Sequence, residues 1–276
     1  MQLLELRRVT KEYPVRTGSK GWFRRRTTLQ AVREVYLTVK KGESVGLVGE
    51  SGSGKSTLAK LIMNLEPVTS GQILLHGQVI NGKRVKPRQI FKQMQLVLQD
   101  SASSLYPKMS VGELLEEPIR NYFPEETEPK KRCVKLLELV ELDDSFLSRY
   151  PHQLSGGQKQ RVCIAKALAV KPEIIIFDES VASLDQPSQA SMMEMLKRIQ
   201  KDEQISYLFI THDLPSAIQL CDRIAVMYQG EIVDTITQGD ERQLRHPYSR
   251  LLFQTLDLES GSVMQEQSSP KRRKRL

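Results

Sequence analysis

The stretch GESGSGKST, residues 49–57, has the residue types and spacing needed to hold a phosphate group. It fits the pattern G-x-x-x-x-G-K-[ST]. Its glycines let backbone N–H groups approach phosphate oxygens, its lysine can reach the β- and γ-phosphates, and the serine hydroxyl can coordinate Mg²⁺. An apolar strand pattern precedes the loop and a helical pattern follows it, which is the expected context. We predict a nucleotide-phosphate site made by Gly49, Glu50, Ser51, Gly52, Ser53, Gly54, Lys55, Ser56 and Thr57.

Two acidic residues close the apolar stretch IIIFDE, residues 174–179. In P-loop enzymes an acidic side chain at the end of a buried strand holds Mg²⁺, and we assign that role to Asp178. The adjacent Glu179 is positioned to polarise the attacking water. A solvated pair of charges at a strand end would have the same sequence. The phosphate loop elsewhere in the chain favours the catalytic interpretation.

His212 and Tyr13 carry weaker signals. His212 follows an apolar strand pattern, and the ends of parallel strands face the ligand crevice. There its side chain could hydrogen-bond the γ-phosphate and sense its loss, although an isolated histidine is usually structural. Tyr13 comes just after the first expected strand, where its ring could stack on adenine. A packing role for Tyr13 remains an open alternative.

A second glycine-containing loop, LSGGQ, begins at Leu154 and runs into a helical pattern that ends near Val170. The N-terminus of a helix attracts phosphate through its free N–H groups and its dipole. The stretch nevertheless has no Lys-Ser pair after its glycines, so it cannot form a complete phosphate loop of the first kind.

Strand and helix patterns alternate along most of the chain, which predicts a parallel sheet with crossover helices. A largely helical stretch from about 111 to 147 predicts an insertion. The expected strands are 3–9, 29–39, 43–49, 72–77, 94–99, 173–179 and 206–213, with a hairpin at 223–234. The expected helices are 55–65, 111–119, 130–142, the stretch after LSGGQ, and 188–200.

Composition restricts the class of protein. Charged residues make up 27% of the 276 residues and hydrophobic residues 39%, which is typical of a globular protein. No apolar run approaches the roughly 18 residues that a membrane helix needs, and the charged N-terminus does not resemble a secretory signal. The three cysteines, Cys133, Cys163 and Cys221, lack metal-ligand spacing, so we expect reduced thiols in a cytosolic compartment.

The net charge of +8 is concentrated near the ends of the chain. The last six residues, KRRKRL, contain five basic side chains, and a further basic cluster lies at residues 20–26. We interpret both as solvated segments, with attraction to an anionic membrane surface as the alternative. We expect no nucleic acid as a partner, because no basic module with interleaved aromatic residues is present.

In their order along the chain, these motifs resemble the nucleotide-binding subunit of an ATP-binding cassette (ABC) transporter. The resemblance covers about residues 3–234, and LSGGQ is the mark of this family. It implies an α/β P-loop NTPase fold with a RecA-like core, an antiparallel β subdomain and an inserted helical lobe at about 100–165. We expect an ABC ATPase domain over 1–259, including a C-terminal segment at about 235–259, and a basic, disordered tail at 260–276.

The resemblance also implies which residues act on ATP and Mg²⁺. Gln99 would complete the Mg²⁺ site with Ser56 and Asp178, and would contribute to catalysis with Glu179, His212 and Lys55. Two such subunits meet head to tail in this family, so LSGGQ would contact the ATP bound by the partner's phosphate loop. The residues expected at that interface are Ser155, Gly156, Gly157, Gln158 and Asp185.

The remaining partners follow from the same resemblance. They are a second, homologous nucleotide-binding subunit or a second copy, two integral membrane permease subunits and an extracytoplasmic substrate-binding protein, which would place this chain peripherally on the cytoplasmic face of the membrane. The segment HPYSRLLFQTL, 246–256, resembles peptide and nickel importer ATPases, and shorter stretches favour nickel. Nickel is therefore the expected cargo, with di- or oligopeptides and another metal chelate as alternatives. His76, His152 and His246 are too far apart in sequence to predict a nickel site. A non-transport cassette ATPase acting on nucleic acid or in translation is disfavoured by the single cassette.

Overall fold

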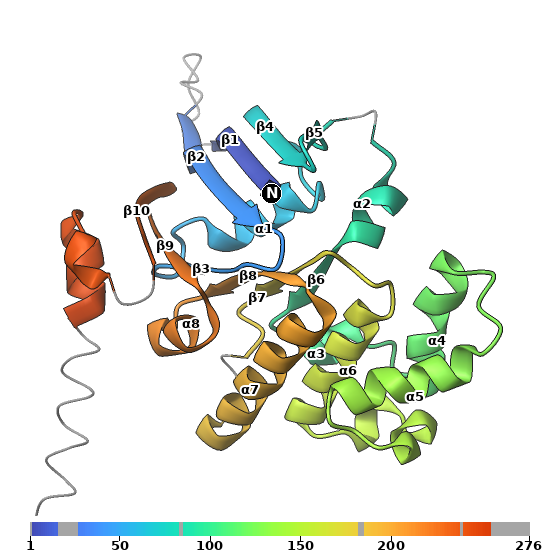
Figure 1. Cartoon of the computed structure of the whole chain (residues 1–276). Coiled ribbons are helices and arrows are strands. Elements are labelled where there is room, and N and C mark those ends of the chain that lie inside the picture. Colours follow the sequence, from blue (N-terminus) through green and yellow to red (C-terminus); the bar gives the residue numbers. More distant parts are fainter. Residues whose placement is uncertain (1, 16–26, 83–84, 182–184, 238–239, 255–276) are drawn as a thin grey trace, which may run out of the picture.

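The computed structural model describes residues 2–15, 27–82, 85–181, 185–237 and 240–254. The basic N-terminal cluster at 20–26 and the predicted tail at 260–276 lie outside these residues. Figure 1 shows an antiparallel sheet above a larger mixed sheet, with helices on the opposite side of the mixed sheet.

The mixed sheet has six strands in the order β10-β9-β3-β8-β7-β6. Its five strands other than β10 run parallel, as the alternation of strands and helices predicted. The three central strands are apolar and buried on both faces, which is typical of a sheet covered on both sides. The strands are β3 (Ser44–Val48), β6 (Met94–Leu98), β7 (Ile174–Asp178), β8 (Ser206–Thr211), β9 (Arg223–Tyr228) and β10 (Glu231–Thr237).

The antiparallel sheet has the order β2-β1-β4-β5, formed by β1 (Gln2–Val15), β2 (Thr27–Lys40), β4 (Ser70–Leu75) and β5 (Gln78–Val79). The prediction that Tyr13 comes just after the first strand is wrong. Strand β1 continues to Val15, and Tyr13 pairs with Leu29 of β2. The polar end of β1 is extended because it pairs with β2, and no apolar alternation in the sequence reports that pairing.

Eight α-helices are present in the described residues, with three short 3₁₀ helices and a further helical stretch at 247–254. The α-helices are α1 (Lys55–Ile62), α2 (Pro87–Gln93), α3 (Ser101–Ser104), α4 (Val111–Tyr122), α5 (Pro129–Leu139), α6 (Gly156–Leu168), α7 (Gln186–Glu203) and α8 (Leu214–Leu220). The 3₁₀ helices are η1 (Asp144–Ser148), η2 (Pro151–Gln153) and η3 (Glu241–Gln243).

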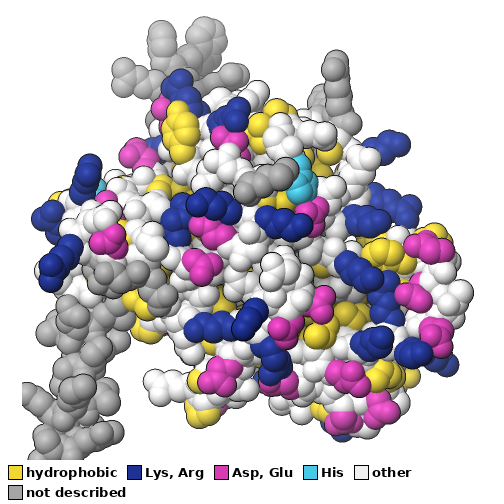
Figure 2. Space-filling view, viewed as in Figure 1, with side chains coloured by type: hydrophobic (Ala, Val, Ile, Leu, Met, Phe, Trp, Pro, Cys, Tyr) yellow, Lys and Arg dark blue, Asp and Glu magenta, His cyan; other side chains and the backbone are white. Residues whose placement is uncertain are grey.

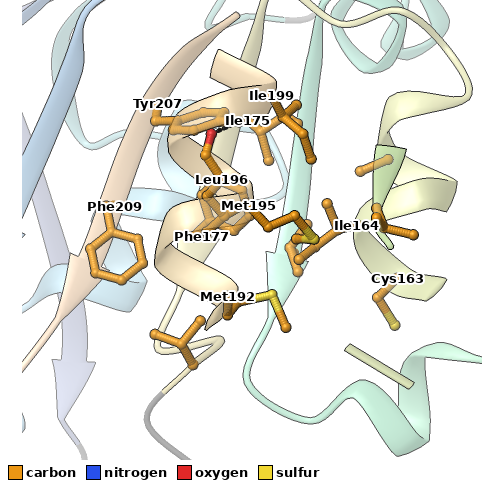
Figure 3. Close-up of a cluster of buried hydrophobic side chains, with 14 of the residues drawn as sticks. Cys163, Ile164, Ile175, Phe177, Met192, Met195, Leu196, Ile199, Tyr207 and Phe209 are labelled. Carbon is orange, nitrogen blue, oxygen red and sulfur yellow. Dashed lines mark hydrogen bonds between the residues drawn. The ribbon is translucent and has the colours of Figure 1, made fainter. Parts of the chain in front are cut away.

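The mixed sheet separates two hydrophobic clusters. On β7, Ile174 and Ile176 face α1 and the antiparallel sheet, whereas Ile175 and Phe177 face helices α6 and α7. Figure 3 shows Phe177 beside Tyr207 under helix α7, and the two rings meet edge to face at 5.1 Å. The fixed packing on both faces holds the ends of the strands in place.

In the sequence, helices α3 to α6 come between β6 and β7. Figure 1 shows α4 and α5 to one side of the mixed sheet. The buried residues of α4, α5 and α6 form one continuous cluster with those of the sheet. The predicted lobe boundary near 165 falls inside α6, whose C-terminal half packs on this cluster. The insertion is therefore joined to the sheet by a shared core.

Within the described residues, no helix combines the length and apolar character needed to cross a lipid bilayer. All three cysteines lie in the described part of the chain, where they are buried and form no disulfide. Burial raises the pKa of the Cys133 thiol to about 11 and that of Cys163 to about 12. Figure 2 shows basic and acidic side chains intermingled over the visible face of the molecule.

Candidate functional site

The phosphate loop follows β3 directly and is confined by neighbouring backbone. A Cβ at Gly49 would lie 2.1 Å from the carbonyl oxygen of Met227, and one at Gly54 would lie 2.2 Å from that of Ala31. Gly54 also has a φ of +108°, which side-chain-bearing residues rarely adopt. The loop therefore depends on glycine both for its backbone conformation and for its close approach to β2 and β9.

Lys55 begins helix α1 and is 4% exposed. Its ammonium donates to the carbonyl oxygens of Gly49 at 2.7 Å and Glu50 at 2.9 Å, so the side chain curls over the loop. Burial lowers the pKa of Lys55, although the carboxylates of Glu179, Asp178 and Glu50 oppose this shift. A buried cation surrounded by carbonyl oxygens and carboxylates is well placed to bind phosphate oxygens.

Ser56 and Asp178 meet although they are far apart in sequence. The Ser56 hydroxyl donates to Oδ1 of Asp178 at 3.0 Å. Burial raises the pKa of Asp178, the Ser56 hydrogen bond lowers it, and the Glu179 charge raises it further. A partly desolvated carboxylate beside a hydroxyl is a site that a divalent cation would stabilise.

The oxygen atoms of Ser56 and Asp178 are suitable ligands for Mg²⁺. Mg²⁺ prefers oxygen ligands, is usually held by one or two carboxylates, and completes its shell with water and substrate phosphates. Ser56 and Asp178 supply a hydroxyl and a carboxylate at the mouth of the phosphate loop. No group of three or more His, Cys, Asp or Glu side chains that could hold a metal ion occurs among the described residues.

Glu179 and His212 lie at the ends of adjacent strands. The backbone N–H of Glu179 donates to the Ile210 carbonyl at 2.9 Å, which continues the pairing of β7 with β8. Its φ of +50° is unusual for a residue other than glycine, and such conformations cluster at functional sites. Nδ1 of His212 lies 3.6 Å from Oε1 of Glu179, and the His212 side chain is 52% exposed.

A hydrogen-bonded loop supports the position of His212. Asp213 caps helix α8 by accepting from Ser216 N–H at 3.2 Å, and its carboxylate also accepts from the Gln189 side chain of α7 at 3.0 Å. The N–H of Asp213 donates to the Thr211 hydroxyl at 3.0 Å. Because His212 lies between these anchored neighbours, its imidazole projects from a fixed backbone.

Gln99 and Tyr13 border this region: Leu98, which precedes Gln99, pairs with Asp178, and the Tyr13 hydroxyl hydrogen-bonds the Thr57 side chain. Gln99 is exposed and immediately follows β6. The Tyr13 hydroxyl hydrogen-bonds the Glu66 carboxylate, and burial together with Glu66 raises the pKa of Tyr13. The ammonium of Lys11 lies 4.9 Å from the centroid of the Tyr13 ring. One face of the ring is thus covered, so a base would have to stack on the other face.

The LSGGQ residues form the start of helix α6. Ser155 is its N-cap: the Ser155 hydroxyl accepts from the Gln158 N–H at 3.3 Å, and the Gln158 side chain accepts from the Ser155 N–H at 3.0 Å. This capping box leaves the Ser155 O–H and the N–H groups of Gly156 and Gly157 available as donors. Asp185 caps helix α7 in a similar way by accepting from Ser188 N–H at 3.3 Å.

The structure brings the first phosphate loop, Asp178, Glu179 and His212 to one edge of the mixed sheet. Across the described part of the chain, no hydrogen bond or ion pair links residues 155–158 to residues 49–57. The residues that brace the phosphate loop were not predicted from the sequence. The N–H of Gly230, in the turn between β9 and β10, donates to the Ser53 carbonyl at 3.0 Å. A turn glycine 177 residues away carries no signal of that contact in the sequence.

The confinement of Gly54 generates a testable prediction. Gly54→Ala should reduce the free energy of unfolding by about 2–4 kcal/mol, because it adds an unfavourable φ and a clash with backbone. Gly52→Ala is the matched control: Gly52 has a φ of +83°, but nothing lies within 4 Å of an added Cβ. Its cost should be about 1–2 kcal/mol. Urea denaturation measures the free energy of unfolding of each variant. Equal losses of stability in Gly54→Ala and Gly52→Ala would contradict the close approach of Gly54 to β2.

Comparison with known proteins agrees with this geometry. Residues 32–182 match the family model described as ABC transporter. The chain is 41% identical over 259 residues to the oligopeptide transport ATP-binding protein OppF of Lactococcus lactis subsp. lactis (strain IL1403), which covers 92% of this chain and 80% of the relative. It is 42% identical over 235 residues to the nickel import ATP-binding protein NikE of Shigella boydii serotype 4 (strain Sb227), covering 84% and 88%.

A solved structure is similar over nearly its full length. It is described as the dimeric structure of a post-hydrolysis state of the ATP-binding cassette MJ0796 bound to ADP and Pi. It superposes with a TM-score of 0.72 at 29% sequence identity, covering 86% of this chain and 99% of that one. The fold predicted from the sequence, a P-loop NTPase with an added antiparallel sheet and helical elements, is therefore confirmed. The chain belongs to the ABC transporter family and is an ATP-binding subunit of that family.

Proposed function

We propose that this chain hydrolyses ATP to drive an importer. The observation that carries the proposal is the convergence of four groups at one edge of the mixed sheet: the phosphate loop, Asp178, Glu179 and His212. They have the residue types that phosphoryl transfer to water requires, namely a phosphate cradle, a cation ligand and a carboxylate able to orient water. The similar cassette, which was solved in a post-hydrolysis state with bound ADP and Pi, supports the proposal of ATP hydrolysis.

Each residue has a role that follows from its position. Lys55 would exchange its contacts with the loop carbonyls for oxygens of the β- and γ-phosphates. Ser56, Asp178 and Gln99 would hold Mg²⁺, which neutralises charge on the phosphates when it is bound. Glu179 would orient the attacking water, and His212 would hydrogen-bond the γ-phosphate beside it. Tyr13 would stack on the adenine through the ring face opposite Lys11.

We propose that the LSGGQ loop forms part of an ATP site that is shared between two subunits. The N-terminus of α6 presents free donors, yet within the described residues no hydrogen bond joins them to the phosphate loop of their own chain. We infer that they bind the γ-phosphate of ATP held by a second nucleotide-binding subunit, which is a homologous ATPase or another copy of this chain. Asp185 would lie at the same interface. The solved structure of a similar cassette is described as dimeric, which supports the pairing of two such subunits.

We propose peptides as the cargo of the importer. The resemblance of short stretches favoured nickel, but the oligopeptide relative matches 92% of this chain against 84% for the nickel relative, at nearly equal identity. Nickel import remains the second candidate because of that relative. The importer would include two permease subunits and an extracytoplasmic binding protein, with this chain peripheral on the cytoplasmic face of the membrane.

The catalytic assignment predicts the effect of one neutral substitution. Glu179→Gln should retain ATP binding but lower kcat by roughly 100-fold or more, because the carboxylate that orients water is lost. Glu173→Gln is the matched control, since Glu173 lies just before the other end of β7 and pairs with His76 at 2.9 Å. Steady-state ATPase assays should find the control close to wild type. Wild-type turnover in Glu179→Gln would refute the role of Glu179.

The cargo assignment predicts the result of an uptake experiment. In cells whose chromosomal copy carries Glu179→Gln, uptake of a labelled oligopeptide should fall to background, because dimer opening needs hydrolysis. Uptake of radiolabelled nickel should stay at the wild-type level. Restoring the wild-type gene should restore peptide uptake. Loss of nickel uptake with normal peptide uptake would reverse the assignment in favour of the nickel candidate.

A further inference from the structure

The C-terminal segment, defined here as residues 240–254, returns to the core after strand β10. Leu244 is 5% exposed and Phe253 is 7% exposed, and both belong to the hydrophobic cluster on the helix-bearing side of the mixed sheet. Tyr248 and Leu252 pack against the same cluster. The segment is therefore an integral part of the fold, and its path along the core is defined.

Polar contacts fix the turn that leads into Tyr248. The Asp234 carboxylate accepts from the backbone N–H groups of Arg245 at 3.2 Å and His246 at 2.9 Å. The N–H of Tyr248 then donates to Nδ1 of His246 at 3.2 Å. The Tyr248 ring stacks on Tyr228 of β9, with a centroid distance of 4.4 Å and an interplanar angle of 25°. These contacts determine where the Tyr248 hydroxyl lies.

That hydroxyl touches the phosphate loop. The backbone N–H of Glu50 donates to Oη of Tyr248 at 2.8 Å, across 198 residues of sequence. Burial raises the pKa of Tyr248, the hydrogen bond from Glu50 lowers it, and the net shift is upward. The group is thus a neutral hydroxyl at physiological pH, and it can accept the hydrogen bond throughout that range.

The Tyr248 hydroxyl holds Glu50, and Lys55 must release the carbonyl of this same residue to bind a phosphate. In this structure the Glu50 carbonyl accepts from the Lys55 ammonium at 2.9 Å, while the Glu50 N–H is held by Tyr248. When Lys55 turns to a phosphate, the carbonyl contact is lost and the Tyr248 contact can persist. The other end of the loop is held through backbone, by Gly230 on Ser53. Tyr248 is the side chain that braces the beginning of the loop.

We propose that Tyr248 is a positioning residue for the phosphate loop, and that the C-terminal segment sets nucleotide affinity through it. The inference rests on the proposed function, because it assumes that the loop binds ATP. Tyr248 does not touch the phosphates. It keeps the Glu50 peptide in the conformation that the nucleotide needs, so its loss should affect binding more than the chemical step.

Tyr248→Phe tests the proposal in the full-length chain, because it removes the hydroxyl and keeps the ring that stacks on Tyr228. Residue-resolved hydrogen exchange without nucleotide should show faster exchange at the Glu50 amide, which has lost its acceptor. The Kd for ATP, measured by titration, should rise roughly two- to tenfold, as expected for one lost hydrogen bond. The KM for ATP should rise similarly, with a smaller change in kcat.

Tyr228→Phe is the matched control. Tyr228 contributes the other ring of the stack, and its hydroxyl accepts from the Gln229 side chain at 3.1 Å; among the described residues no hydrogen bond joins that hydroxyl to residues 49–57. It should leave the Glu50 exchange rate and the ATP affinity near wild type. Unchanged exchange in Tyr248→Phe, or equal effects of the two variants on affinity, would overturn the proposal. The exchange experiment contains no nucleotide, so it tests the contact between Tyr248 and Glu50 whether or not the chain binds ATP. Failure of the wild-type chain to bind ATP would refute the proposed function and leave the contact intact.

Discussion

The parallel register of β3, β7 and β8 is the constraint on which the rest of the site depends. Val48 pairs with Thr211, and Asp178 pairs with Ile210, so the three strands end at the same level. Whatever follows each strand is therefore delivered to one edge, as in other open α/β sheets. The phosphate loop follows β3, Glu179 follows β7 and His212 follows β8. The apolar residues on both faces hold this register, because a shift of one residue would reverse every side chain between the two clusters.

The sequence predicted the parts of the site that are encoded locally. The phosphate loop, the acidic pair after β7 and the histidine after β8 each sit beside an apolar strand, and strand and loop chemistry are both visible within a few residues. The polar end of β1 was missed because it is extended only through pairing with β2. The contacts of Gly230 with Ser53, and of Tyr248 with Glu50, join residues more than 100 positions apart. Such contacts depend on packing that no local pattern reports.

The local geometry of the second glycine-containing loop, LSGGQ, offers a physical explanation of its sequence. Ser155 and Gln158 satisfy two backbone donors of α6 reciprocally, which orders the start of the helix without a ligand. The donors that remain belong to the exposed residues Ser155 and Gly156 and to the half-buried Gly157, and donors at a helix N-terminus favour an anion. In the proposed function, an ordered but incomplete phosphate site on the surface would account for the absence of a lysine after its glycines, since the partner would supply that cation. Assembly and catalysis would then be linked by the same phosphate group.

The most direct test of this account is a crystal structure of the chain with Mg²⁺ and a non-hydrolysable ATP analogue. We expect the triphosphate on residues 49–57, with Lys55 turned from the Gly49 and Glu50 carbonyls toward phosphate oxygens. We expect the cation between Ser56 and Asp178, and the γ-phosphate facing Glu179 and His212. A triphosphate bound away from the ends of β3, β7 and β8, or a cation that contacts neither Ser56 nor Asp178 directly or through water, would contradict the account.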